Sequence, residues 1–529
     1  MVQEMNLAVS PEEAADEEAL KKIILATLHD KIKDFKDYRI TRRSIDARKR
    51  NILINLKIEI YSDKEPVNHI PTFYFHQASP DWSVVIIGAG PAGLFAALRL
   101  LEAGIRPIII DRGKTVRERR RDIAELNKNH IVNPDSNYCY GEGGAGTYSD
   151  GKLYTRSTKR GDVKKILELL IFHGADCEIL IDAHPHIGTN KLPAIIENIR
   201  ETILSCGGEF HFHTRLSDII IEQDCIKSII THSTINKEQK VFDTDTLILA
   251  TGHSARDIFE LLIRKNILIE AKPFAMGVRV EHPQELIDSI QYHCRNTIEV
   301  KKARKFLPPS SYSLVHQVNG RGVYSFCMCP GGIIAPCATS PEEVVVNGWS
   351  PSKRNNLYAN AGVVVEIQME DLTAYSRYGK FAGVQYQRDL EHMAFEAGGR
   401  SQTAPAQRLT DFVNGKFSST LPESSYQPGI KSAPLHDLLP KNISLSLRSA
   451  FKQFEQRMHG YLTNAAVIHG VESRTSSPIR IPRNKETFQH TCIKGLYPVG
   501  EGAGYAGGIV SAAIDGQSCA EQVAIQLKG

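Results

Sequence analysis

Hydrophobic residues near the N-terminus follow the pattern of a small α+β domain. Over residues 19–35 they recur at helical intervals, and over residues 52–61 (ILINLKIEIY) they alternate with polar residues as in a half-buried strand. Residues 1–18 are acidic and polar, so we expect them to be frayed or irregular. We assign residues 1–78 to this domain and expect a linker within residues 68–81, which hold two prolines.

A stronger pattern at residues 83–111 predicts a strand, a glycine-rich turn, a helix and a second strand in succession. The first strand is the unbroken apolar run of residues 84–87, which is typical of a strand buried on both faces of a parallel sheet. The second strand, residues 105–110, ends at Asp111. The turn carries glycines in G-x-G-x-x-G spacing, which are Gly88, Gly90 and Gly93. This order within about thirty residues is typical of a dinucleotide-binding unit.

Each part of this unit has a physical task in binding a dinucleotide. Gly88 permits the tight turn, Gly90 lets the backbone approach a pyrophosphate, and Gly93 lets the helix pack closely on the strand. The helix expected over residues 91–103 presents unpaired N–H groups and the positive end of its dipole to the phosphates. Asp111 is placed to accept hydrogen bonds from a ribose hydroxyl. The other residues that we expect at the cofactor here are Pro91, Ala92 and Arg112.

The C-terminal region contains a second glycine-rich turn between a strand and a helix. In residues 495–516 a short strand leads to Gly500 and Glu501, and a helix is expected to start near Gly508 and Ile509. Glu501 can bind ribityl hydroxyls, and the helix N-terminus can stabilise the negative charge that an isoalloxazine gains on reduction. A dehydrogenase that binds only NAD has no need of this second unit. The sequence therefore predicts FAD, bound non-covalently.

Two further segments are expected to lie against the cofactor. Five glycines fall within residues 141–151, and this density is better explained by backbone lying against a flat ligand than by a flexible hinge. Further along, the strand expected over residues 246–250 runs into a Thr-Gly pair, which suits a chain that passes close to the cofactor. The residues that we expect at the cofactor in these segments are Gly143, Gly144, Thr251 and Gly252.

The intervening region, residues 273–469, mixes strand-like and helical patterns. This predicts a substrate domain inserted into the cofactor domain, which then comprises residues 79–272 and 470–529. The predicted fold class is α/β, with a Rossmann-like FAD-binding domain that places a parallel sheet between helices, an inserted α+β substrate domain and a small N-terminal α+β domain.

Together these motifs resemble those of FAD-dependent dehydrogenases of unassigned substrate, in the glutathione-reductase-like flavoprotein superfamily with two dinucleotide-binding domains. The resemblance covers nearly the whole chain and includes three motifs of the second lobe, residues 276–283 (MGVRVEHP), 327–332 (CMCPGG) and 470–478 (GVESRTSSP). It implies a ferredoxin-like N-terminal domain, a fold term that involves no iron–sulfur cluster. It also implies that Asp111 binds the adenosine ribose, although glutamate is the commoner residue there.

Composition and charge argue against several other classes of protein. A chain of 529 residues is expected to form two or three domains, and a net charge of +4 gives no argument for a nucleic-acid partner. No run of 18 apolar residues predicts a membrane span, and the acidic N-terminus does not resemble a secretory signal. Ten cysteines without a framework spacing suit reduced thiols in the cytoplasm. No metal is expected, because no ligand spacing is present.

Candidate catalytic residues are few. Cys327 and Cys329 form a C-x-C pair. It could supply a thiol at the flavin or a metal site, or the two cysteines could be small buried residues of a strand. The buried strand residues are favoured, since free cysteine usually behaves as a small hydrophobic residue. Arg474 could clamp a carboxylate or phosphate, or form a structural salt bridge, and the sequence leaves both open. Lys152 could lie near the flavin, although an exposed position is favoured. The candidates are therefore Cys329, Arg474 and Lys152.

The predicted activity is hydride transfer between flavin N5 and an unidentified small substrate or a nicotinamide. Because no second G-x-G-x-x-G follows a strand, NAD(P)H is expected to bind only transiently if it takes part. The alternative is an RNA-associated or sensor flavoprotein without turnover, since basic residues cluster in residues 39–50. Acidic and basic residues are equal in number over residues 1–80, which favours a solvated face instead. The oligomeric state is left open.

Overall fold

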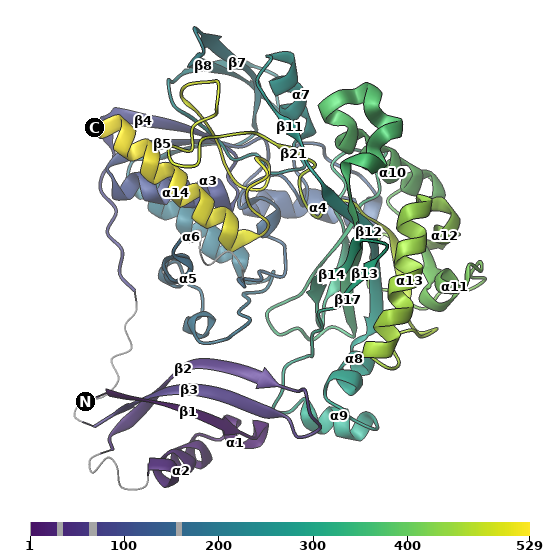
Figure 1. The fold of residues 1–529 in the computed structure, drawn as a ribbon. Coiled ribbons are helices and arrows are strands. Elements are labelled where there is room, and N and C mark those ends of the chain that lie inside the picture. Colours follow the sequence, from purple (N-terminus) through teal and green to yellow (C-terminus); the bar gives the residue numbers. More distant parts are fainter. Residues whose placement is uncertain (1, 29–34, 63–70, 155–160) are drawn as a thin grey trace.

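The computed structural model describes residues 2–28, 35–62, 71–154 and 161–529, which form three parts (Figure 1). A five-stranded parallel sheet with helices forms the first part, and a seven-stranded sheet with helices lies to its right in the figure. A three-stranded N-terminal sheet lies below both. The predicted fold class, a Rossmann-like domain with an inserted α+β domain and a small N-terminal α+β domain, is confirmed.

The parallel sheet has the strand order β22-β10-β4-β5-β6. Its strands are β4 (Ser79–Ile87), β5 (Ile105–Ile110), β6 (Glu209–His211), β10 (Leu247–Leu249) and β22 (Leu496–Pro498). The central strand β4 is buried on both faces, with Val84 and Ile86 in the core on one side and Val85 and Ile87 in the core on the other. This two-sided burial explains the unbroken apolar run of the sequence.

Helices from distant parts of the chain cover one face of the parallel sheet. They are α3 (Pro91–Glu102), α5 (Val163–Phe172), α6 (Leu192–Ser205) and α14 (Ile509–Lys528). Helices α3 and α14 lie side by side (Figure 1). Their contact is so close at Gly516 that an added Cβ would lie 2.0 Å from the carbonyl oxygen of Ala92. The two glycine-rich turns that precede these helices are thereby brought together.

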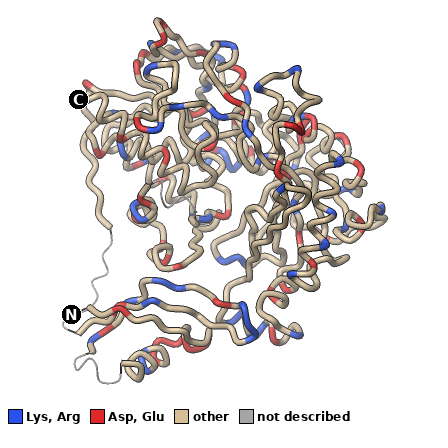
Figure 2. Tube along the Cα trace, viewed as in Figure 1, with Lys and Arg blue, Asp and Glu red and all other residues tan. Residues whose placement is uncertain are grey.

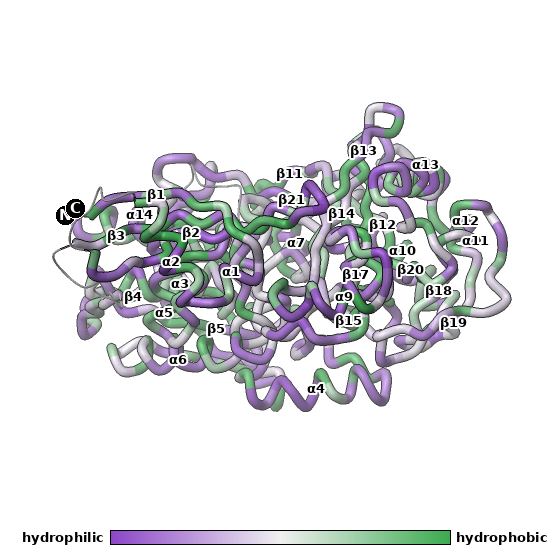
Figure 3. Tube along the Cα trace, turned by 90° about the horizontal axis from the view of Figure 1, so that it is seen from below, coloured by the Kyte–Doolittle hydropathy of each residue, from purple (hydrophilic) through white to green (hydrophobic). Residues whose placement is uncertain are grey.

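The opposite face of the parallel sheet is covered by a second, antiparallel sheet and a helix. These elements are β7 (Thr214–Glu222), β8 (Cys225–Ser233), β9 (Gln239–Asp243) and α7 (Arg256–Arg264). Helix α4 (Val116–Asn129) lies at the edge of the molecule and is largely hydrophilic in Figure 3. It buries Val116, Arg119 and Leu126. Two short turns of 3₁₀ helix, Gly144–Gly146 and Cys177–Leu180, complete this part.

The second lobe contains a seven-stranded sheet with helices packed on one face. In spatial order the strands are β13 (Val315–Val318), β14 (Arg321–Cys329), β17 (Tyr358–Ile367), β12 (Phe274–Pro283), β20 (Val467–Glu472), β18 (Ala404–Arg408) and β19 (Ile430–Ser432). The helices are α10 (Ala382–Gly398), α11 (Leu409–Asn414), α12 (Leu435–Leu438) and α13 (Lys441–Arg457). Along β12, Met276, Val278 and Val280 lie in the core with these helices. Arg279 therefore lies on the other face, because side chains alternate along a strand.

Smaller elements connect the two lobes and extend the second. They are β11 (Glu270–Ala271), α8 (Gln284–Gln291), α9 (Thr297–Ala303), β15 (Ile333–Pro336), β16 (Val346–Trp349), the 3₁₀ segment Met369–Phe381 and β21 (Ile479–Arg480). Strands β11 and β21 pair antiparallel. The chain enters the seven-stranded sheet with β12 and leaves it with β20, and then returns to the parallel sheet through β22. Strand β20 crosses the boundary expected at residue 469 and ends at Glu472.

The N-terminal domain is a three-stranded antiparallel sheet in the order β1-β3-β2, with helices on one face. Its elements are β1 (Val2–Val9), α1 (Pro11–Ala15), α2 (Glu17–Leu28), β2 (Asp37–Asp46) and β3 (Leu53–Tyr61). The domain is docked on the parallel-sheet part at Arg43, whose N–H donates to the carbonyl of Ile181 at 2.9 Å. On the other side its core includes Tyr292 and Leu307 of the second lobe.

One expectation from the sequence is wrong. Residues 1–18 are not irregular, because β1 pairs with β3 over its whole length and α1 begins with a capping box at Ser10. The end of the helix predicted over residues 19–35 and the start of the predicted linker include residues 29–34 and 68–70, which lie outside the described part of the chain.

Charged residues of both signs are interspersed throughout the chain (Figure 2). In the basic N-terminal segment, several arginines form ion pairs: Arg39 with Glu59, Arg43 with Asp182 and Glu178, and Arg48 with Asp46. Three of the six basic residues in this segment are therefore balanced by acids. Within the ranges that the structure describes, no helix combines the length and the apolar character needed to cross a bilayer.

Candidate functional site

A cavity of about 370 Å³ lies at the carboxyl ends of four parallel strands and extends to the second lobe. Ligands bind at this edge of open α/β sheets. Ile87, Ile110 and Val499 line the cavity from the strand ends, and Phe326 and Cys327 line it from the second lobe. The predicted residues that line it are Gly88, Gly90, Pro91, Ala92, Asp111, Arg112, Gly144, Lys152, Thr251, Gly252, Arg474, Gly500, Glu501, Gly508 and Ile509.

Three predicted residues lie behind the lining of this cavity. Gly93 packs on the turn, since an added Cβ would lie 2.0 Å from the carbonyl oxygen of Gly88. Gly143 has a φ of +76° and faces Thr147, whose Oγ1 would lie 2.0 Å from an added Cβ. Cys329 is fully buried beneath Cys327. These positions point to a structural task for the two glycines, while Cys327 is the cysteine of the C-x-C pair that reaches the cavity.

The backbone of Gly90 shows that the cavity fits a dinucleotide. Its φ of −78° is open to any residue, and an added Cβ would meet nothing closer than the Cα of Gly144 at 3.9 Å. Neither strain nor protein packing therefore requires glycine there. The N-cap of α3 is the place where a pyrophosphate approaches a helix N-terminus, so the missing side chain is explained by the space that a ligand needs.

Asp111 orders the first glycine-rich turn. Its carboxylate accepts from the N–H of Ala89 and from the N–H of Gly113, each at 2.8 Å. Only 8% of the residue is exposed, at the wall of the cavity. Each carboxylate oxygen can accept a second hydrogen bond, so this arrangement leaves acceptor capacity for a ribose hydroxyl.

The glycine-rich loop of residues 138–147 is held by a buried arginine of α4. Arg119 is 0% exposed, and its guanidinium donates to four backbone carbonyls at 2.7–2.8 Å, those of Asn137, Tyr138, Glu142 and Gly144. The loop turns back on itself around this side chain and presents Gly144 to the cavity. The sequence of α4 contains four arginines, and nothing in it distinguishes Arg119 from the others.

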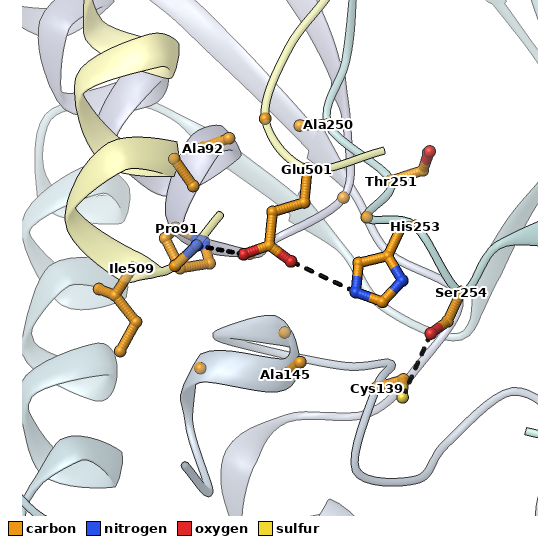
Figure 4. Close-up of a pocket in the computed structure, with 18 of the residues that line it drawn as sticks. Pro91, Ala92, Cys139, Ala145, Ala250, Thr251, His253, Ser254, Glu501 and Ile509 are labelled. Atoms are coloured by element: carbon orange, nitrogen blue, oxygen red, sulfur yellow. Dashed lines mark hydrogen bonds and ion pairs between the residues drawn. The ribbon is translucent and has the colours of Figure 1, made fainter. Parts of the chain in front are cut away.

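At the C-terminal turn, Glu501 caps the start of α14. Its carboxylate accepts from the N–H of Gly508 at 2.5 Å and lies 3.4 Å from Nε2 of His253 (Figure 4). Burial and the nearby Arg474 and Arg256 lower the pKa of His253 to about 4, so the imidazole is neutral at pH 7. No sequence pattern pointed to His253, which follows the predicted Thr251-Gly252 pair.

The same turn is fixed from behind by an ion pair. The N–H of Gly500 donates to Asp515 at 2.7 Å, and Arg483 donates to Asp515 at 2.5 and 3.0 Å. Arg483 also donates to the carbonyl of Pro498 at 2.7 Å. Elsewhere in the lining of the cavity, one guanidinium nitrogen of Arg112 donates to both carboxylate oxygens of Asp257, at 2.7 and 2.9 Å.

Lys152 lies among sulfur and carboxylate groups at the second-lobe end of the cavity. Its Nζ is 3.3 Å from Sγ of Cys329, 3.7 Å from Sγ of Cys327 and 3.2 Å from Asp150. Burial opposes its charge, but the two sulfurs and Asp150 outweigh burial and raise the pKa of Lys152. The favoured expectation that Lys152 is simply exposed is therefore wrong, and the structure brings together two of the three catalytic candidates.

Arg474, the third candidate, belongs to a buried network of ion pairs. It donates to Glu391 at 2.9 and 3.0 Å and to Glu343 at 2.7 Å, and Arg256 bonds the same two carboxylates at 2.9 Å. Its remaining terminal nitrogen donates to Thr339 at 2.7 Å. Of the two alternatives that the sequence left open, the structure therefore shows the salt bridge.

This network predicts a loss of stability in acid. Burial alone would raise the pKa of Glu391, but Arg256 and Arg474 outweigh it and lower the pKa from 4.5 to about 2. A carboxyl whose pKa is lower in the folded state stabilises the fold above its unfolded pKa and ceases to do so as the pH falls. We expect about 3 kcal/mol to be lost between pH 4.5 and 2, measured by unfolding at a series of pH values.

The Glu391→Gln variant tests this origin of the acid sensitivity. It should be less stable than the wild type at pH 7 and show a shallower loss of stability below pH 4.5. The matched control is Glu396→Gln, since Glu396 forms an exposed pair with Arg400. An unchanged pH profile in the Glu391 variant would contradict the assignment.

Comparisons with known protein families match three parts of the chain. Residues 81–133 match an FAD binding domain, residues 273–475 match the C-terminal domain-like part of FAD-dependent proteins, and residues 1–61 match a domain of unknown function. An uncharacterized protein from Clostridium beijerinckii is 37% identical over 528 residues, which cover 96% of each chain. The chain therefore belongs to a family of FAD-dependent proteins that includes this relative. Its cofactor is FAD.

Solved structures also resemble the chain at low sequence identity. A flavoprotein/dehydrogenase from Cytophaga hutchinsonii is 11% identical, with a TM-score of 0.37 over 84% of this chain and 79% of that chain. A geranylgeranyl bacteriochlorophyll reductase-like protein from Thermoplasma acidophilum is 12% identical, with a TM-score of 0.34 over the same shares of the two chains.

Proposed function

We propose that the chain is an FAD-dependent oxidoreductase whose reaction takes place at the second-lobe end of the cavity. The observation that carries the proposal is that one cavity joins the open backbone of Gly90 and Gly508 to the side chains of Lys152 and Cys327. The first pair suits the phosphates and the flavin edge, and the second pair supplies charged and nucleophilic groups. A cofactor that bound only for structure would not need such groups at its end.

The residues present would hold FAD in one orientation. Gly88, Gly90 and Asp111 would bind the pyrophosphate and the adenosine ribose, since they lie at the N-terminus of α3 and the end of β5. Glu501 and Gly500 would lie along the ribityl chain. Helix α14 begins at Ile509, so its first N–H groups have no acceptor within the helix and are suited to the flavin O2 edge.

Bound FAD supplies the transfer of a hydride at N5. The protein would contribute positive charge at that end of the cavity, through the Lys152 ammonium and the N-terminus of α14, where the reduced flavin carries negative charge. Burial behind Phe326 and the second-lobe sheet would exclude water from the reacting atoms. The substrate is an unidentified small molecule, and NAD(P)H would bind transiently as electron donor or acceptor.

Anaerobic mixing of the FAD-loaded chain with NADH, NADPH and a panel of metabolites tests this function. We expect the flavin absorbance to be bleached by at least one donor and restored by an acceptor. If FAD is retained but no donor of either kind exchanges electrons with it, the chain is a sensor flavoprotein and the oxidoreductase proposal fails. The ion pairs of the N-terminal arginines favour the enzyme over an RNA-docking role.

Replacing Lys152 with methionine should make the flavin harder to reduce. Loss of a positive charge beside the reduced, anionic flavin is expected to lower the midpoint potential by about 30 mV or more, which is about 1.4 kcal/mol for two electrons. The potential is measured against a redox dye, so no substrate is needed. Lys164→Met serves as control, because Lys164 lies on the surface with 74% of its side chain exposed. An unchanged potential would show that the ammonium does not face the flavin.

A further inference from the structure

The C-x-C pair lies at an irregularity of strand β14. The pairing of β14 with β17 shifts register between Phe326 and Cys329, so β14 has one extra residue at this point. Cys327 has a φ of +47°, which is uncommon for a residue other than glycine. Such bulges redirect side chains. Here the bulge places Cys327 at the cavity while Cys329 stays fully buried.

Two cationic side chains from different elements converge on these sulfurs. The Lys152 Nζ lies within 3.7 Å of both, and Nη2 of Arg279 lies 3.6 Å from Sγ of Cys329 and donates to the carbonyl of Cys327 at 2.9 Å. The Cys329 thiol donates to the same carbonyl at 3.2 Å. Lys152 follows the glycine-rich residues 141–151, and Arg279 comes from β12. Both cations lose contact with water in this position, a cost that an ordinary buried thiol would not offset.

Other groups around the pair carry opposite charge and limit the effect of the cations. Asp150 pairs with Lys152, Glu472 pairs with Arg279 at 2.9 Å, and Glu501 lines the same cavity. The hydrogen bond from Cys329 is the main cause that lowers the pKa of Cys327, against burial, and Lys152 and Arg279 add to it. Burial raises the pKa of Cys329. Of the two sulfurs, Cys327 is therefore favoured as the thiolate and Cys329 is favoured to keep its proton.

The structural cysteines of the chain differ from this arrangement. Cys519 is buried in the apolar core between α14 and the parallel sheet, and burial raises its pKa. Cys206 lies in the same apolar core. A cysteine that serves only as a small hydrophobic residue packs against apolar groups and does not require an ammonium and a guanidinium beside its sulfur. The surroundings of Cys327 and Cys329 are those of a reactive thiol.

We propose that Cys327 and Cys329 form a second two-electron redox site, a dithiol that exchanges its electron pair with FAD. The Cys327 thiolate and the Cys329 thiol form an S–S bond, and the two electrons together with the thiol proton pass to oxidised FAD. The products are the disulfide and reduced, singly protonated flavin, so atoms and charge balance. In the reverse direction, reduced flavin opens the disulfide, and Cys327, whose position is at the cavity, can pass the electrons to a disulfide-containing acceptor.

This inference rests on the proposed function, because it needs bound FAD. An anaerobic dithionite titration of the FAD-loaded chain tests it, and we expect about four electrons per FAD before reduction is complete in the wild type. The Cys329→Ala and Cys327→Ser variants should take up about two electrons. If the wild-type chain binds FAD but takes up only two electrons, the dithiol proposal is wrong, while the proposed oxidoreductase function still stands. A chain that takes up no FAD would overturn the proposed function instead.

Alkylation and peptide mass mapping give a second readout that does not depend on turnover. In the oxidised protein the peptide with Cys327 and Cys329 should carry a disulfide, and in the reduced protein both sulfurs should be alkylated after unfolding. Cys337→Ser is the matched control, since Cys337 is near in sequence but does not line the cavity, and it should still form the disulfide. Full alkylation of Cys327 and Cys329 in the oxidised protein would contradict the proposal.

Discussion

Replacing Gly90 with glutamate is expected to abolish the retention of FAD while the fold stays intact. The glutamate Cβ has space in the protein, but its carboxylate would occupy the N-cap of α3 beside the pyrophosphate. Steric overlap and repulsion between like charges cost several kcal/mol, so we expect binding to weaken by at least about 100-fold. The flavin content after purification and FAD titration of the apo-protein measure the effect, and circular dichroism reports on the fold.

The Gly90→Ala variant is the control for this prediction. Because an added Cβ meets no protein atom closer than 3.9 Å, alanine should leave the thermal midpoint unchanged and reduce FAD affinity far less than glutamate. If Gly90→Glu purifies with the flavin content of the wild type, the pyrophosphate does not lie at this turn.

Replacing Arg119 with methionine should have the second large effect, on stability and FAD binding together. The substitution removes the guanidinium from all four carbonyls. The carbonyls of Asn137 and Tyr138 lose the most, because those of Glu142 and Gly144 also accept from Thr147. Each unsatisfied buried acceptor costs about 1–3 kcal/mol, so we expect the loop to open and the fold to lose at least about 3 kcal/mol. Thermal unfolding and proteolysis within residues 138–147 measure the change, and FAD should restore stability only partly.

Arg121→Met on the same helix is the matched control, because Arg121 is exposed and its replacement removes the same charge. It should leave both flavin content and the thermal midpoint close to those of the wild type. Equal behaviour of the two variants would mean that the charge of α4, rather than the hydrogen bonds of Arg119, supports the loop.

Local sequence patterns were sufficient to predict the cofactor domain. Strand β4, the turn at Gly88 and helix α3 are adjacent in the chain, so the apolar run and the glycine spacing together predict this strand–turn–helix unit. The N-terminal strand β1 was missed because it is an edge strand with mostly exposed side chains, and its apolar alternation is limited to Met5, Leu7 and Val9. Edge strands are defined by their partner, here β3, rather than by their own sequence.

The reactive end of the site could not be predicted, since it depends on tertiary contacts. Lys152 and Cys329 are far apart in the sequence, and only the packing of the chain at Lys152 against β14 places Nζ 3.3 Å from the sulfur. In the same way, the sequence could not tell whether Arg474 binds a ligand or Glu391. Arg119 looked like any other arginine of a basic helix, because burial at one position of α4 depends on the loop folded against it.

A crystal structure of the FAD-loaded chain is the most direct test of the central claim, the orientation of FAD in this cavity. We predict density for one FAD per chain, with the adenosine beside Asp111, the pyrophosphate at Gly90, and the isoalloxazine between Gly508 and the Lys152–Cys327 pair. An isoalloxazine beside Asp111, or FAD bound outside the cavity, would contradict the account.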